Sequence, residues 1–306
     1  MRTALRRLSP ASQAIEPLAA PSDVSCVFAG HSGATITLYG SGVQAYVRKQ
    51  AADVARNERL MRQAEKQRLL CAHGVALPRV LGEGVGEDKR AFFDMEYVPG
   101  RTVADAVIHA APIDRAALLR SLGNLLWLFQ MQQGDALSPA LFHAKIDEIG
   151  TKCATRMPTN RRMAEIWGCG AKLMAYDWDG VPQSPCHGDL TLENILLTRK
   201  RGIVFIDCDE PFASSWWLDV AKLFQDVQGH WCIRTLYGTA EPAQFLNAVQ
   251  KIDQLSGDLY KLVANDALRE KLPQLTALHL FRCLPYVKQE DVVNFVCARI
   301  QHVLNA

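Results

Sequence analysis

The sequence predicts an α+β fold in two lobes: a small N-terminal lobe with an antiparallel sheet and one helix, and a larger, mainly helical C-terminal lobe. Three observations lead to this prediction. Short β-rich segments separated by glycine-bearing turns occur within the first hundred residues, helical patterns dominate after about residue 100, and one polar hairpin at 185–211 interrupts those helices. At 306 residues the chain is long enough for two such lobes. We expect an N-terminal arm at 1–20, the first lobe at 21–98 and the second at 99–306.

The N-terminal lobe begins with three β-rich segments, which we expect at Ser25–Ala29, Ala34–Tyr39 and Gln44–Lys49. The turn between the first two contains Gly30, His31, Ser32 and Gly33. Glycine in such a turn lets backbone N–H groups approach a phosphate closely. Taken alone this signal is weak, because an ordinary hairpin turn has the same composition.

A long helix is predicted from Asp53 to His73, with Gly74 as its stop. Glu65 lies on the line of Met61 and Leu69, so we expect it to point inward. A carboxylate on an apolar stripe needs a cationic partner. Two further strands are expected at Arg79–Leu81 and Ala91–Tyr97, with the glycine-rich run 82–86 as a turn between them.

After residue 100 the periodicity is that of helices. They are expected at Val103–Ala111, Asp114–Gln133, Leu141–Lys152, Asn160–Tyr176 and from Trp217 to the end. Asp114 is a candidate N-cap. The hairpin lies between the last two of these regions, with two short strands on either side of the basic turn Thr198–Gly202.

The polar residues of this hairpin point to phosphoryl transfer. The hairpin is expected to hold Asp189, Asn194 and Asp207 around one point. Moving a γ-phosphoryl group requires a carboxylate that orients and deprotonates the attacking hydroxyl, and oxygen ligands for Mg²⁺. Asp189 is the candidate base, Asn194 and Asp207 are candidate metal ligands, and Asp209 is a possible additional ligand.

These residues resemble a known family. His187, Asp189 and Asn194, followed by Asp207, resemble the catalytic loop and metal-binding Asp of the protein-kinase-like superfamily. With His-Gly-Asp in place of His-Arg-Asp, the chain looks like the aminoglycoside phosphotransferase and choline kinase branch. The resemblance implies a bilobal kinase-like fold, ATP and Mg²⁺ as cofactors, a small-molecule hydroxyl acceptor, and a nucleotide covered by the 30–33 turn. The run from Asp207 to Asp219 leaves no room for the activation loop of a protein kinase.

The resemblance also implies roles in the N-terminal lobe. A strand cation pairs with the helix Glu65 to position the phosphates, and Arg48 and Lys49 compete for that role. The two preceding apolar residues favour Arg48, which is familiar from choline kinases, whereas the spacing to Glu65 suits Lys49; we prefer Arg48.

The segment from Met95 to Gly100 is similar to the family's hinge between the lobes. The resemblance implies backbone contacts from Glu96 and Val98 to adenine, with Met95 at the back of its pocket. It also implies that Asp219 caps the catalytic loop from a helix.

Composition excludes several classes of function. The formal net charge is +2, with no basic field for nucleic acid. No apolar run reaches the roughly 18 residues needed to span a bilayer. Nine cysteines without a Cys-x-x-Cys pair fit free thiols, and hence a cytoplasmic location. The first ten residues fit a loose arm, although an organellar transit peptide stays open. Nothing in the sequence indicates the oligomeric state.

The acceptor itself is not encoded in a motif. An aminoglycoside would require clustered carboxylates, whereas acids and bases balance in the helical lobe. Choline would require an aromatic cage, which Trp216, Trp217 and Trp231 could supply. The runs 218–225 and 279–286 resemble phosphotransferases of bacterial surface-glycan loci, which favours a sugar or amino sugar. A kinase-like regulatory module without turnover and an atypical protein kinase are the alternatives.

Overall fold

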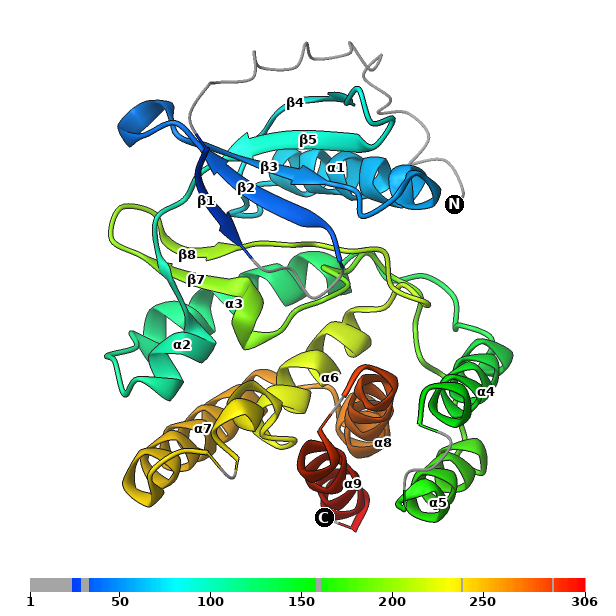
Figure 1. The fold of residues 1–306 in the computed structure, drawn as a ribbon. Coiled ribbons are helices and arrows are strands. Elements are labelled where there is room, and N and C mark those ends of the chain that lie inside the picture. The colour runs from blue at the N-terminus through cyan, green and yellow to red at the C-terminus, as the bar shows by residue number, and fades with distance from the viewer. Residues whose placement is uncertain (1–23, 29–32, 158–160, 238, 288, 306) are drawn as a thin grey trace. The chain divides into compact units, whose positions relative to one another are not determined.

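The computed structural model describes residues 24–28, 33–157, 161–237, 239–287 and 289–305 (Figure 1). The chain divides into two compact units, residues 1–99 and residues 100–306. The fold is mixed α+β, as the sequence predicts, with an antiparallel sheet in the first unit and mainly helices in the second. The expected arm at 1–20 and three residues of the expected phosphate turn, Gly30, His31 and Ser32, lie outside the described residues.

Unit 1 is built on an antiparallel sheet with the strand order β1-β2-β3-β5-β4. The strands are β1 (Val24–Phe28), β2 (Thr35–Tyr39), β3 (Tyr46–Gln50), β4 (Val80–Val85) and β5 (Ala91–Glu96). The three predicted N-terminal strands are confirmed. A short 3₁₀ turn at Gly42–Gln44 delays the start of β3 by two residues relative to the prediction.

The prediction of a turn at 82–86 is wrong. Gly82 and Gly84 belong to strand β4, and the chain turns between Gly86 and Arg90. Gly84 stands opposite Phe92, whose ring would lie 3.0 Å from a Cβ at that position. Glycine therefore makes room for a cross-strand aromatic ring, which explains glycine in the middle of a strand.

Helix α1 (Asn57–Ala72) covers one face of this sheet (Figure 1). The core between helix and sheet contains Ala51, Leu60, Ala64, Ala91 and Phe93. Asp53 caps a single 3₁₀ turn, Val54–Arg56, that precedes α1. Gly74 follows the helix with φ of +83°, as a C-terminal stop requires.

Unit 2 consists mainly of helices with one small antiparallel sheet (Figure 1). The sheet contains β6 (Arg101–Thr102), β7 (Ile195–Thr198) and β8 (Gly202–Phe205). The helices are α2 (Val103–Ile108), α3 (Arg115–Gln130), α4 (Pro139–Arg156), α5 (Met163–Met174), α6 (Trp216–Val227), α7 (Pro242–Leu262), α8 (Asp266–Cys283) and α9 (Glu290–Asn305). The predicted hairpin around Thr198–Gly202 is confirmed, and Asp114 caps α3 through the Ala117 N–H.

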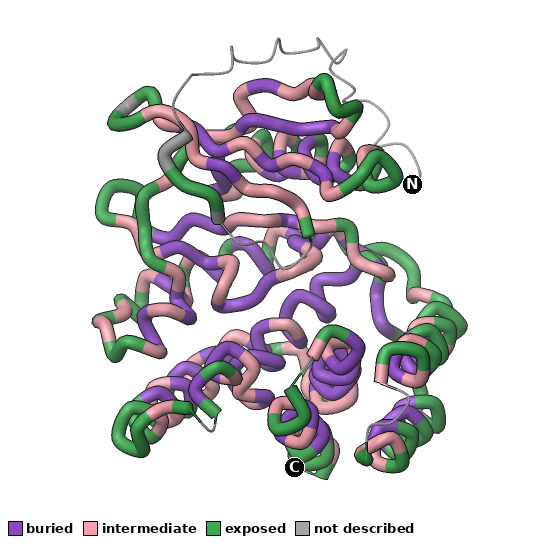
Figure 2. The backbone as a smooth tube through the Cα atoms, viewed as in Figure 1, coloured by how far each residue is buried: buried purple, intermediate pink, exposed green. Residues whose placement is uncertain are grey.

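Helix α6 lies at the centre of unit 2. It packs against α3, α7 and α8, and every one of its residues is buried except the half-buried Lys222 (Figure 2). Such a helix is a rigid support for the groups that it carries. Within the described residues, no helix is both long and apolar enough to cross a membrane.

Candidate active site

The loop before strand β7 is held to the segment after strand β8 by backbone hydrogen bonds. Ile206 N–H donates to the Asn194 carbonyl at 2.9 Å, and Asp209 N–H donates to the His187 carbonyl at 3.0 Å. These two bonds lie on either side of Asp207 in the sequence. The hairpin therefore joins the segment that carries Asp189 and Asn194 to the segment that carries Asp207.

Gly188 gives this loop its shape. Its φ is +92°, a region that L side chains rarely adopt, and its N–H points to a carboxylate on α6. The neighbouring His187 is fully buried, and its N–H reaches the same carboxylate. The His-Gly-Asp sequence thus places a rigid turn directly before Asp189.

The Asp189 carboxylate has a partner on each oxygen. Asn194 Nδ2 donates to Asp189 Oδ2 at 2.9 Å and to the Asp189 carbonyl at 2.8 Å. Lys222 Nζ lies 2.9 Å from Asp189 Oδ1. Burial acts to raise the pKa of Asp189, but Lys222, His187 and Arg282 outweigh it, so the pKa lies below its usual value. Asp189 is therefore a fixed and ionised carboxylate at neutral pH.

Asn194 and Asp207 have the oxygen chemistry that Mg²⁺ requires. The Asn194 amide nitrogen donates its hydrogen bonds to Asp189, so the Asn194 amide oxygen points away from Asp189. This amide oxygen accepts no hydrogen bond from the described residues. Asp207 has a φ of +57°, a left-handed conformation that is strained for a residue other than glycine and is typical of functional positions. Asp209 Oδ1 accepts the Glu210 N–H at 2.8 Å.

Among the described residues there is no group of three or more His, Cys, Asp and Glu side chains that could hold a metal ion. In phosphoryl-transfer sites Mg²⁺ is generally bound by one or two carboxylates and completed by substrate phosphates and water. The donor set of Asn194 and Asp207 therefore suits a metal that arrives with a nucleotide.

One face of α6 holds the catalytic loop at three points. Asp219 accepts the N–H groups of His187 and Gly188, as the sequence predicts. Lys222, three residues on, pairs with Asp189. Asp226, a further four residues on, accepts the Leu192 N–H at 2.6 Å.

The sequence prediction overlooked Lys222 and Asp226. Their signal was available, because three charged residues at spacings of three and four lie on one face of a helix that is otherwise apolar except for Gln225.

The two strand cations in unit 1 lie on opposite faces of the sheet. Arg48 stands opposite Asp94 and donates to its two carboxylate oxygens at 2.7 and 2.9 Å. Lys49 stands opposite Phe93, which packs against α1, so Lys49 is on the face that the helix covers. The preference for Arg48 as the partner of the helix is therefore wrong. Lys49 is the cation on that face, and it is only 3% exposed.

The expectation that Glu65 points inward is also wrong. Glu65 is exposed and forms no hydrogen bond or ion pair with the described residues, and Leu69 on the same line is 44% exposed. The buried line of α1 consists of Leu60, Gln63, Ala64, Gln67 and Leu70. Its polar members are amides, which avoid the cost of a buried charge, and Gln67 donates to the Pro78 carbonyl at 2.7 Å. No pair between Glu65 and either strand cation is formed.

The expected hinge follows β5. Met95 packs against the core beneath α1, and Glu96 N–H donates to the Arg79 carbonyl at 3.0 Å. An adenine contact at Glu96 would therefore involve its carbonyl. Val98 lies two residues beyond the strand and is half-buried. Gly33 is the one described residue of the expected phosphate turn, and its φ is +78°.

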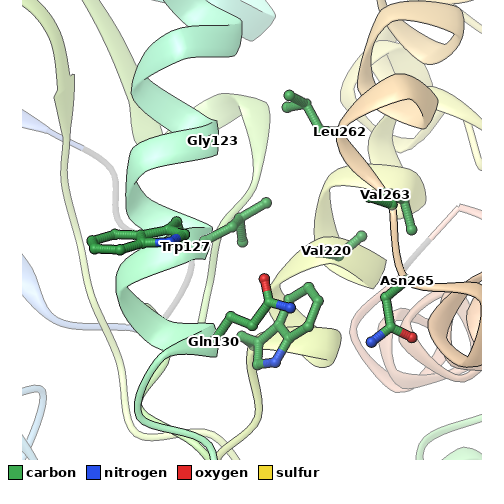
Figure 3. Close-up of a pocket in the computed structure, with 10 residues that line it drawn as sticks. Gly123, Trp127, Gln130, Val220, Leu262, Val263 and Asn265 are labelled. Carbon is green, nitrogen blue, oxygen red and sulfur yellow. The ribbon is translucent and has the colours of Figure 1, made fainter.

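A groove of about 450 Å³ in unit 2 is lined by residues of α3, α6 and the connection between α7 and α8 (Figure 3). None of the loop residues Asp189, Asn194 and Asp207 lines it. Its polar side chains are the amides Gln130 and Asn265, together with two Trp rings, and it contains no titratable group. The groove lacks the acid–base and metal-binding groups that the catalytic loop offers.

Comparison with known proteins finds one family model that matches most of the chain. The model of a phosphotransferase enzyme family matches residues 28–260. A search of curated proteins finds no relative.

Solved structures resemble the chain in fold. A thermostable mutant of aminoglycoside phosphotransferase APH(4)-Ia, in a ternary complex with ADP and hygromycin B, is 15% identical with a TM-score of 0.59, over 93% of this chain and 94% of that one. An assigned fructosamine-3-kinase from Haemophilus somnus 129PT is 15% identical with a TM-score of 0.54, over 91% and 90%. An aminoglycoside-3'-phosphotransferase of type VIII is 20% identical with a TM-score of 0.52, over 85% and 92%.

Proposed function

This chain belongs to the phosphotransferase enzyme family, and we propose that it transfers the γ-phosphoryl group of ATP to a hydroxyl group of a small molecule, with a sugar or amino sugar as the favoured acceptor. The observation that carries the proposal is the Asp189 carboxylate, which Asn194 and Lys222 hold on both oxygens within a loop anchored to α6. A carboxylate held in place on both oxygens can orient a hydroxyl group for attack on the γ-phosphorus atom.

In the proposed reaction the acceptor oxygen forms a bond to the γ-phosphorus atom while the bond between that atom and the β–γ bridging oxygen breaks. ADP leaves, and the hydroxyl proton passes to Asp189 and then to solvent. Because the pKa of Asp189 is lowered, Asp189 is a weak base whose main contribution is orientation. Proton transfer is expected late, when the attacking oxygen has become acidic through bonding to phosphorus.

Mg²⁺ would be held by Asn194 and Asp207, with Asp209 as a possible further ligand. When bound, it would neutralise charge that develops on the phosphate oxygens. The role of the chain's own residues is to fix the ligand atoms. The two backbone bonds that flank Asp207 in the sequence, and the orientation of the Asn194 amide by Asp189, do this before any nucleotide arrives.

The nucleotide would contact unit 1. Lys49 replaces Arg48 as the proposed phosphate-binding cation, because it shares a face with α1. The Glu96 carbonyl and the Val98 N–H are the proposed adenine contacts. Nucleotide binding is supported by the neighbour of similar fold that was solved with ADP.

An ADP-release assay over a panel of hydroxyl compounds, with and without Mg²⁺, tests this function. We expect metal-dependent ADP release that requires one class of acceptor and is accompanied by a phosphorylated product in mass spectrometry. Tight binding of Mg-ATP with no product from any acceptor would favour the regulatory module instead.

A further inference from the structure

Arg282 on α8 is a half-buried cation without a carboxylate partner. Its Nη1 donates to His279 Nδ1 at 2.9 Å, and its Cζ lies 5.0 Å from the centre of the Phe212 ring. No carboxylate of the described residues lies within ion-pair distance of the guanidinium. Burial lowers the pKa of Arg282, which reflects the cost of removing its charge from water. A cation in this state gains stability when an anion binds to it.

The surroundings of Arg282 connect it to the catalytic loop. Helix α8 packs against α6, which holds that loop (Figure 1). The Phe212 ring belongs to the segment that follows the candidate metal ligand Asp207. The charge of Arg282 also acts on Asp189, where together with Lys222 it favours the ionised carboxylate. Arg282 therefore lies close to the group that would orient the acceptor hydroxyl.

The ion pairs around Asp189 do not include Arg282. Lys222 is paired with Asp189, and Glu193 is paired with Arg234 at 3.0 Å. Asp209 attracts Arg282 but lies beyond ion-pair distance from it. His279, which holds the guanidinium, is fully buried and must be neutral at Nδ1 to accept its hydrogen bond. Within the part of the chain that the structure describes, Arg282 therefore forms no ion pair with a carboxylate.

We propose that the acceptor carries a carboxylate or phosphate group, and that Arg282 binds this group while Asp189 orients the hydroxyl group. The inference rests on the proposed function and narrows its substrate class to anionic sugar derivatives, namely sugar acids and sugar phosphates. The planar guanidinium matches two oxygens of either group. Polycationic acceptors, such as the aminoglycosides, are disfavoured next to Arg282 because its charge repels them.

The test is an acceptor panel measured with wild type, Arg282→Gln and Arg282→Lys. The panel contains neutral sugars, amino sugars, sugar acids and sugar phosphates, and each compound is assayed for ADP release and for a thermal-unfolding shift at low ionic strength. Arg269→Gln is the matched control, because Arg269 lies on the same helix and pairs with Asp266 at 3.3 Å. A folded state with the wild-type melting profile is required of each variant before its kinetics are interpreted.

We expect turnover and stabilisation with anionic compounds only. Arg282→Gln should raise the acceptor KM by about tenfold or more. Arg282→Lys should recover part of the lost affinity for the acceptor, and Arg269→Gln should leave the acceptor KM unchanged. The assays with sugar acids and with sugar phosphates show which of the two anionic groups Arg282 prefers.

Three outcomes overturn the inference. The first is a higher kcat/KM with neutral or cationic acceptors. The second is an effect of Arg282→Gln on the KM for ATP rather than on that for the acceptor. The third is the absence of any Arg282-dependent shift with the anionic compounds. The proposed function would fail in a different way, through the absence of Mg²⁺-dependent phosphoryl transfer to every member of the panel.

Discussion

Lys222→Met should weaken both the stability of the protein and the reactivity of Asp189. The Lys222 ammonium lies 2.9 Å from Asp189 Oδ1, and methionine keeps the length of the side chain while removing its charge. Burial of the Asp189 carboxylate is then opposed only by Asn194 and by more distant cations. The pKa of Asp189 should therefore rise, and the carboxylate should lose one of the two contacts that fix its orientation.

The size of the effect follows from the exposure of the pair. Exposed ion pairs contribute at most about 1 kcal/mol, and removing one partner of a fully buried pair costs about 3–5 kcal/mol. The Lys222 side chain is 13% exposed and that of Asp189 is 36% exposed, so the pair lies between these limits. We expect the free energy of unfolding to fall by about 1–3 kcal/mol at pH 8. Loss of orientation should lower kcat by about 10²-fold.

The pH dependence gives the sign of the effect. A lowered pKa stabilises the fold above the pKa of the unfolded carboxyl, near 4, and this stability is lost as the pH falls through the folded value. The stability difference between wild type and Lys222→Met should therefore be largest at pH 7–8 and should shrink below about pH 4. The acid limb of the kcat profile should move to higher pH.

Urea unfolding at several pH values and a pH–kcat profile measure both effects. Lys261→Met is the control, because Lys261 is 77% exposed and its pair with Asp258 should contribute little. An unchanged kcat together with an unmoved acid limb would refute the role given to Lys222.

Three further predictions concern other groups. Burial raises the pKa of Asp226 to about 7, so its contribution to stability is complete below about pH 4 and is lost as the pH rises through about 7. Urea unfolding should then show the wild type losing about 1.4 kcal/mol per pH unit relative to Asp226→Asn across that window, and parallel curves would contradict the burial argument. Asp207→Ala should abolish the Mg²⁺ dependence of ATP binding in calorimetry while the melting temperature changes little; full turnover in EDTA would exclude its role as a ligand. Lys49→Met should weaken Mg-ATP binding about tenfold or more, whereas Arg48→Met should cost about 3–5 kcal/mol of stability because it leaves Asp94 buried without its partner. Weaker Mg-ATP binding in Arg48→Met, with normal binding in Lys49→Met, would restore Arg48 as the phosphate cation.

The catalytic hairpin could be predicted from the sequence because its signals are local. A turn, two short β-rich runs and polar residues at fixed spacings indicate a hairpin whose flanking segments contain Asp189, Asn194 and Asp207. The role of Asp219 was accessible as well, through the resemblance of the loop and the following helix.

The errors arose where tertiary packing decides between neighbouring residues. Adjacent strand residues point to opposite faces, so a shift of one residue exchanges Arg48 and Lys49, and only the pairing with Asp94 on another strand settles the choice. On α1 the apolar stripe through Met61 and Leu69 competed with the one that is buried, and no local signal separates the two. Arg282 could not be assigned from the sequence because the Phe212 ring that it contacts lies in the segment after Asp207, far from α8 in the chain.

The most direct test of the proposed function is Asp189→Asn, measured in single-turnover phosphoryl transfer beside ATP affinity. Asparagine keeps the size of the side chain, and its amide oxygen can still accept the Asn194 hydrogen bond, so the loop should keep its conformation although the ion pair with Lys222 is lost. Positioning and base catalysis by a carboxylate contribute about 10²–10⁴-fold in rate, while ATP affinity should depend on unit 1 and the metal ligands. We predict a transfer rate reduced by about that factor with a nearly unchanged Kd for Mg-ATP. A wild-type transfer rate in Asp189→Asn would contradict the account, because another residue would then orient the hydroxyl group.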